Sequence, residues 1–105
     1  MGNIKQTKAY RELKKAMLDN LTARGLNDKP YTDKVEEYMD FWARRKELRD
    51  DVAARGLTVV DDRGRMSENR SVSLEIQVSR QMLNLFTALG FDSDDVKPPE
   101  DDDDL

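Results

Sequence analysis

The stretch Arg55-Gly-Leu-Thr-Val-Val-Asp-Asp-Arg-Gly-Arg-Met-Ser-Glu-Asn69 decides the fold, because it places a miniature β-hairpin between two long helical patterns. Gly56 ends the preceding helix, and the β-branched run at residues 57–60 predicts a short strand. Residues 61–64 predict a polar turn in which Gly64 is free to take positive φ. We therefore expect a hairpin over about residues 57–67.

The helix before the hairpin is predicted over about residues 32–55. Asp33 and Glu36 have the spacing of a capping box, and Pro30 is expected to end the preceding turn. The apolar residues of this helix form a seam that is wider than one neighbouring helix needs, and Arg45 lies on that seam. We therefore expect an oligomer interface here, formed by Tyr38, Phe41, Trp42, Arg45, Leu48 and Val52.

Two further helices complete the predicted domain, which covers residues 1–91. The helix after the hairpin is predicted over about residues 71–89, with Ser71 or Ser73 as its cap. Its expected core face comprises Val72, Ile76, Leu83 and Phe86, with Met82 and Leu89 beside it. The first helix is predicted over about residues 5–24, and its buried face comprises Tyr10, Leu13, Met17 and Leu21.

These patterns predict a mainly α fold class. The two long helices would form an antiparallel helical hairpin whose connection is the small β-hairpin, with the N-terminal helix packed across it. Residues 92–105 contain eight acidic residues and one lysine, and are predicted to be a disordered acidic tail. The tail is either a solubility device, a competitor of DNA, or a partner-binding segment, formed by Asp101, Asp102, Asp103, Asp104 and Leu105.

Cations gather on two of the predicted helices. Lys8, Arg11 and Lys15 project from the first helix opposite its apolar face, with Lys14 on the flank. Arg44, Arg45, Lys46 and Arg49 form a second cluster. Either cluster is a solvated face, with internal ion pairs in the second, or a patch that faces phosphates and gains from counterion release. If the clusters face phosphates, the DNA-binding residues are Lys8, Arg11, Lys14, Lys15, Arg44, Arg45 and Arg49.

The composition argues against most enzyme classes. The chain has no cysteine and no histidine, which excludes thiol catalysis, an imidazole base and a Cys/His zinc site. Asp61 and Asp62 are interpreted as turn residues, and no Gly-rich phosphate loop is present. We expect no enzyme activity, no cofactor and no metal. Without a signal peptide or an apolar run of about 20 residues, we expect a cytoplasmic protein with no membrane contact.

The order of these elements resembles that of phage terminase small subunits. Residues 13–25 are similar to the family's first helix ending, and residues 48–56 to its leucine, basic run and glycine before the hairpin. Asp33 and Tyr38 match the acidic start and early tyrosine of the next helix. The ending Leu85-Phe-Thr-Ala-Leu-Gly-Phe91 matches the family's last helix, except that Phe91 replaces an aliphatic residue. Arg70 after Asn69 departs from the family's Asn-Pro.

The resemblance implies a non-catalytic subunit of the viral DNA packaging machinery. Such a subunit forms a homo-oligomeric ring, recognises the packaging site on double-stranded viral DNA in the host cytoplasm, and recruits and regulates the terminase large subunit, which holds the ATPase and nuclease. Two alternative functions do not depend on the resemblance. The chain could be a small helical transcription regulator, or a protein-interaction adaptor whose basic clusters are solvated.

Overall fold

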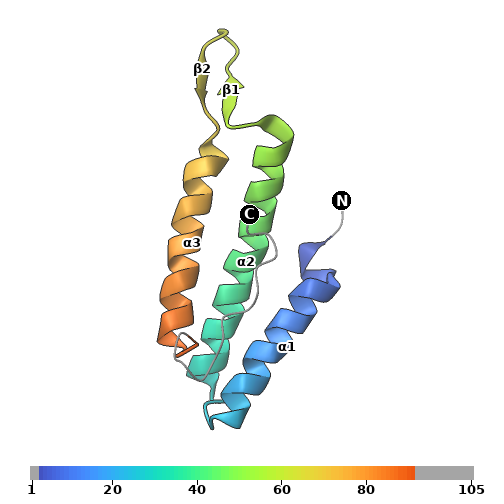
Figure 1. The fold of residues 1–105 in the computed structure, drawn as a ribbon, viewed down its shortest axis with the longest axis vertical. Helices are drawn as coiled ribbons and strands as arrows, with labels where there is room; N and C mark the ends of the chain where they lie inside the picture. Colours follow the sequence, from blue (N-terminus) through green and yellow to red (C-terminus); the bar gives the residue numbers. More distant parts are fainter. Residues whose placement is uncertain (1–2, 92–105) are drawn as a thin grey trace.

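The computed structural model, which describes residues 3–91, is built around two long antiparallel helices joined by a β-hairpin (Figure 1). These helices are α2 (Lys29–Arg55) and α3 (Arg70–Ala88), and the strands between them are β1 (Thr58–Val60) and β2 (Met66–Glu68). A short 3₁₀ turn, η1 (Ile4–Gln6), precedes α1 (Lys8–Ala23). The predicted fold class is confirmed for the described residues; the expected acidic tail, residues 92–105, lies outside them.

The helix α1 lies beside the N-terminal half of α2 and runs antiparallel to it (Figure 1). The rings of Tyr10 and Trp42 form a T-shaped pair at a centroid distance of 5.8 Å. Tyr10, Met17 and Leu21 are buried, as their spacing predicts, and Leu13 is half-buried. Because α1 begins near Trp42 and runs toward the start of α2, the second half of α2 has α3 as its main helical neighbour among residues 3–91.

The β-hairpin projects from the end of the helical pair (Figure 1). Its strands are antiparallel, with Val59 opposite Ser67 and Val60 opposite Met66. The carboxylate of Asp61 accepts hydrogen bonds from the backbone N–H groups of Arg63 and Arg65, at 2.9 and 2.8 Å. Asp61 is therefore a turn-building residue, in agreement with its interpretation from the sequence.

The start of α2 corrects the sequence prediction. The helix begins at Lys29, with Asp28 as its N-cap residue, rather than near residue 32. Pro30 lies in the first turn of the helix instead of blocking it, because the first N–H groups of a helix have no intrahelical acceptor and a missing donor costs nothing there. Asp33 and Glu36 consequently lie inside the helix.

The core lies between the three helices at the end opposite the hairpin. Its contributors from α3 and the segment after it are Val78, Met82, Phe86, Leu89 and Phe91. Gly90 adopts φ +78°, which lets Phe91 turn back so that its N–H reaches the Phe86 carbonyl at 3.1 Å. Arg24 covers this turn, since its Nη2 donates to the Leu89 carbonyl at 2.7 Å.

The core face of α3 also differs from the prediction. Ile76 and Leu83, expected in the core, are 52% and 62% exposed, and Val72 is half-buried. Phe86, Met82 and Leu89 are buried as expected, and they are joined by Val78. The cause is the rotation of α3 about its axis, which is set where the helix begins.

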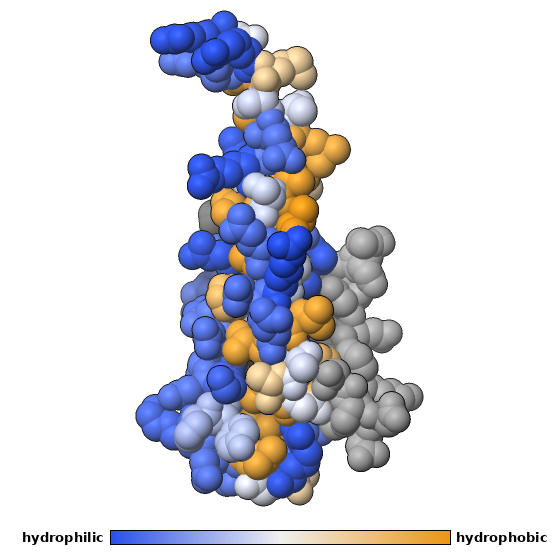
Figure 2. All heavy atoms as spheres, turned by 90° about the vertical axis from the view of Figure 1, so that its left-hand side faces the viewer, coloured by the Kyte–Doolittle hydropathy of each residue, from blue (hydrophilic) through white to orange (hydrophobic). Residues whose placement is uncertain are grey.

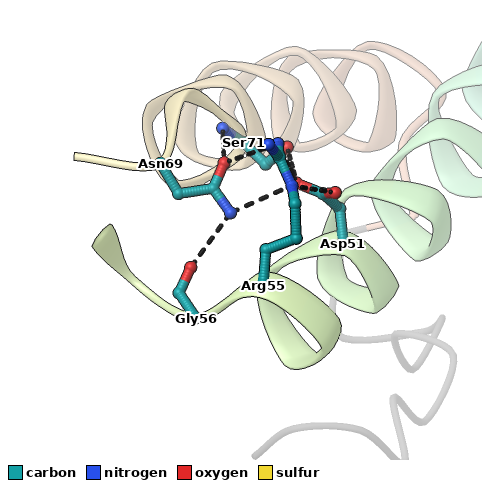
Figure 3. Close-up of polar contacts among 5 residues, drawn as sticks. All are labelled: Asp51, Arg55, Gly56, Asn69 and Ser71. Atoms are coloured by element: carbon teal, nitrogen blue, oxygen red, sulfur yellow. Dashed lines mark hydrogen bonds and ion pairs between the residues drawn. The ribbon is translucent and has the colours of Figure 1, made fainter. Parts of the chain in front are cut away.

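A polar network fixes the start of α3 against the end of α2 (Figure 3). Asn69, which is 0% exposed, caps α3 by accepting the N–H of Ser71 at 3.0 Å, and its side-chain amide donates to the Gly56 carbonyl at 3.0 Å. The carboxylate of Asp51 accepts from the Ser71 hydroxyl at 2.7 Å and from Arg55 Nε at 2.7 Å. The expected cap at Ser71 or Ser73 is thus corrected to Asn69.

These contacts hold the pKa of the Asp51 carboxyl well below its usual range, first through Arg55 and then through Ser71 and Asn69. A carboxyl whose pKa is lowered by folding stabilises the fold above its unfolded pKa of about 3.9 and loses that contribution as the pH falls toward the folded pKa. The network therefore makes stability depend on pH in the acid range.

We predict that Asp51→Asn lowers the free energy of unfolding at pH 7, because the neutral amide replaces the anion that Arg55 and Ser71 contact. The difference from the wild type should shrink as the pH falls from 5 to 3, since the wild-type carboxyl then loses its advantage. Urea unfolding followed by circular dichroism, at pH 7 and at pH 3, measures this difference in the free energy of unfolding. A difference that stays constant between pH 7 and pH 3 would contradict the assigned role.

Candidate nucleic-acid interface

The outer face of α1 presents three cations to solvent. Lys8, Arg11 and Lys15 are exposed on the side of the helix opposite Tyr10 and Met17. Lys8 Nζ lies 3.7 Å from the carboxylate of Glu12, and Lys15 Nζ lies 2.7 Å from that of Asp19. Such exposed pairs contribute little, so a phosphate can replace the carboxylate partner at small cost.

Lys14 does not share this face. Its Nζ lies 2.7 Å from the carboxylate of Glu36 in α2, and its side chain is 29% exposed. The hydrogen bond to Glu36 raises the pKa of the Lys14 ammonium above its ordinary value. Lys14 therefore ties α1 to α2, and its charge is already matched within the chain.

The second cationic cluster, on α2, also contains both ion-paired and exposed side chains. Arg49 Nε lies 2.6 Å from the Glu75 carboxylate in α3, and both side chains are about three-quarters buried, at 27% and 25% exposure. Arg45 is half-buried and is not without a partner. Arg44 is exposed and forms no ion pair with another residue of the described range 3–91. Of these three arginines, Arg44 is the one whose charge faces solvent.

Arg44 lines a groove of about 740 Å³ between α2 and α3. Arg80 enters the groove from α3, is exposed and has no ion-pair partner among the described residues. Lys5 lies at its edge, where Asp40 pairs with its ammonium and raises its pKa. The acidic Asp40 and Glu47 also line the groove, so its charge is mixed.

The sequence did not indicate that Arg80 lies near Arg44. The two residues line one groove because α2 and α3 pack against each other. No local signal gives the register of α2 against α3. The predicted cations thus occupy two surfaces, the outer face of α1 and the groove between α2 and α3, and the structure does not join them into one patch.

The expected oligomer interface on α2 is largely covered by the chain itself. Tyr38 is 8% exposed and its ring lies 6.1 Å from that of Phe86 in α3. Phe41, Trp42 and Leu48 are half-buried and pack against the core, and Val52 is also half-buried. The seam of α2 is thus occupied mainly by α1 and α3 of the same chain.

Neither a metal site nor a membrane span is found in the described part of the chain. Within residues 3–91, no group of acidic side chains is arranged to hold a metal ion. No helix in that range has the length and apolar character needed to cross a membrane.

The family model described as phage terminase, small subunit, matches residues 11–97. The chain belongs to the phage terminase small subunit family. This match covers all but the first three residues of α1, together with α2, the β-hairpin and α3, and it includes Arg11, Lys15 and Arg44. No curated protein and no solved structure matches the chain.

The family places this terminase small subunit in phage DNA packaging, where small subunits are generally non-catalytic. Asn69, which belongs to the Asn-Pro pattern named in the resemblance, is the buried cap of α3. Arg70, which departs from that pattern, occupies the first position of the helix. Proline is favoured at the first position of a helix because its missing N–H is not needed there, and α3 begins at the same place with arginine.

We predict that Arg49→Gln lowers the free energy of unfolding by about 1–3 kcal/mol, because it leaves the largely buried Glu75 without its charged donor. Arg44→Gln is the matched control and should change stability by less than about 0.5 kcal/mol, since Arg44 is exposed. Urea unfolding at pH 7 compares the two variants. Equal losses would contradict the division between structural and available arginines.

Proposed function

We propose that this terminase small subunit binds double-stranded viral DNA and brings it to the terminase large subunit, which it recruits and regulates. The observation that carries the proposal is the exposed cationic face of α1, formed by Lys8, Arg11 and Lys15, in a chain of the packaging family. Arg44 is a secondary DNA contact. The family match favours this role over the regulator and adaptor alternatives.

The proposal narrows the set of DNA-binding residues expected from the sequence. Lys14 and Arg49 pair with acidic side chains of other helices, and Arg45 is half-buried. Contacts with a phosphate would have to break the pairs of Lys14 and Arg49, whereas the local pairs of Lys8 and Lys15 are exposed and weak. The first contact with DNA is therefore assigned to the outer face of α1.

The proposed subunit acts as a homo-oligomeric ring. A single α1 face offers three exposed cations, which is few for stable binding at physiological salt. Repetition of that face around a ring raises the overall affinity without a stronger single site, because each further contact is intramolecular.

We predict that replacing Lys8, Arg11 and Lys15 together by glutamine weakens binding to double-stranded DNA by about tenfold or more at low salt. The slope of log affinity against log salt should fall by about two to three, since each lost phosphate contact releases one counterion fewer. Fluorescence anisotropy with a labelled duplex measures both quantities.

The matched control replaces three other exposed cations, Lys29, Lys34 and Arg63, by glutamine, which changes the net charge equally. The control should keep most of the affinity. Equal losses in both triple variants would reduce DNA binding to a net-charge effect, and unchanged affinity in the α1 variant would overturn the proposed site.

The acidic segment formed by Asp101, Asp102, Asp103, Asp104 and Leu105 lies outside the described residues and stays a proposed contact with the large subunit. We predict that deletion of residues 93–105 abolishes capture of the large subunit in a pull-down assay and leaves DNA affinity unchanged. A rise in DNA affinity would instead identify the tail as a competitor of DNA. Unchanged capture together with unchanged affinity would remove the idea.

A further inference from the structure

The groove between α2 and α3 combines apolar and cationic side chains. Val78 is buried and Phe41 and Leu74 are half-buried, so these lining residues lie deeper than the exposed Arg44 and Arg80. Apolar side chains also stay exposed among charged ones on the α3 side of the molecule (Figure 2). A segment that binds along α3 therefore meets both kinds of side chain.

The charge of the groove favours an acidic ligand. Lys5 and Asp40 line it as an ion pair, so their charges cancel. Of the other charged lining residues, Arg44 and Arg80 are cationic and Glu47 is acidic, which leaves a surplus of one positive charge. Neither arginine has an ion-pair partner within residues 3–91. Arginine binds carboxylates through its planar fork of donors, so an acidic peptide segment matches this groove.

The chain itself contains such a segment. The acidic tail, residues 92–105, lies outside the described residues and contains eight acidic residues and one lysine. Five of the acids follow one another at residues 100–104, and the apolar Val96 and Leu105 lie on the two sides of this run. The tail therefore supplies carboxylates for the two arginines and apolar groups for the deeper part of the groove.

The place where the tail leaves the fold puts the groove within its reach. Phe91 is 2% exposed, and its ring lies 5.4 Å from that of Phe86, so the tail begins beside α3. The lining residues Gln81 and Leu74 lie ten and seventeen residues before Phe91, which is about 15 and 26 Å along a helix. An extended chain covers this distance with about five to eight residues. The acidic run begins nine residues after Phe91, so it can lie along the groove.

We propose that the acidic tail docks in the α2–α3 groove of its own chain, where Arg80 and Arg44 bind carboxylates of residues 100–104. Exposed ion pairs of this kind are weak one by one. The tail is covalently attached, however, so its effective concentration at the groove is high and weak contacts suffice to hold it there.

The docked tail regulates the contact with the terminase large subunit. This consequence rests on the proposed function, which assigns residues 101–105 to that contact. Because the groove and the large subunit bind the same segment, capture of the large subunit requires release of the tail from the groove. The α1 cations Lys8, Arg11 and Lys15 do not line the groove, so the docked tail leaves the proposed DNA face open.

Cysteine cross-linking in the full chain tests the docking directly, because the chain has no cysteine of its own. Asp103→Cys together with Gln81→Cys places one thiol in the acidic run and one in the groove. Asp103→Cys together with Ala16→Cys is the control, since Ala16 is exposed on α1 and eight residues from Arg24, whose guanidinium lies 5.3 Å from the Phe91 ring. At low salt the groove pair should close its internal disulfide about fivefold faster or more. Non-reducing gels and peptide mass spectrometry follow the reaction.

Removal of one arginine provides the second readout. Arg80→Gln, added to the groove pair, should slow disulfide formation toward the rate of the control pair, because it removes a cation that binds the tail. Arg63→Gln removes an exposed arginine of the hairpin turn and should leave the rate unchanged. High salt should also slow the groove pair more than the control pair, since it screens exposed ion pairs. Far-ultraviolet circular dichroism verifies that all variants are folded.

Capture of the large subunit tests the regulatory consequence. In the chain without added cysteines, Arg80→Gln should strengthen binding of purified terminase large subunit by about threefold, because a larger fraction of the tails is free to bind. Arg63→Gln should bind it as the wild type does. Biolayer interferometry with the immobilised small subunit measures both affinities.

Several results would overturn the proposal. Equal rates for the two cysteine pairs would show that the tail does not dock in the groove, and a faster α1 pair would identify the tail as a competitor of DNA. Disulfides that join two chains would contradict docking within one chain. Unchanged capture by the Arg80→Gln chain would refute the regulatory consequence. Failure of the proposed function is separate: a wild-type chain that captures no large subunit loses the recruitment role, whereas the cross-linking rates still decide the docking.

Discussion

The carboxylate of Asp51 is the contact on which the rest of the structure depends. It joins the end of α2 to the start of α3 through Ser71 and Asn69, and Arg55 holds it as an anion. This contact sets where α3 begins and how it is rotated. With that rotation fixed, Val78 and Phe86 face the core, while Ile76 and Leu83 face solvent.

The fold could be predicted from local signals, and the rotation of α3 could not. Gly56, Gly90 and the β-branched run of β1 are local signals, and they indicate the helix ends and the hairpin. The sequence of α3 contains two apolar stripes, and periodicity does not say which one meets α2. The buried cap at Asn69 decides which stripe meets α2. It does so through contacts with Gly56 and Asp51, which lie 13 and 18 positions earlier in the chain.

The candidate site could also be predicted only in part from the sequence. The sequence located both cationic clusters, because they depend on spacing along single helices. It could not separate structural cations from available ones, since the acids that match Lys14 and Arg49 belong to other helices. Glu36 and Glu75 lie 22 and 26 residues from their partners, beyond the reach of any local pattern. Once the cations that form ion pairs between helices are set aside, the exposed face of α1 and Arg44 remain as candidate DNA contacts.

The central proposal for this small subunit is that it binds double-stranded DNA as a homo-oligomer, with the cationic face of α1 repeated in every copy. The most direct test is the solution mass of the purified wild-type chain by light scattering after size exclusion, at low and high salt. The proposal predicts a discrete assembly of several 12.1 kDa subunits, because the three exposed cations of one copy are few for stable binding and repetition raises the overall affinity. A monomer at all concentrations and salt levels would contradict it.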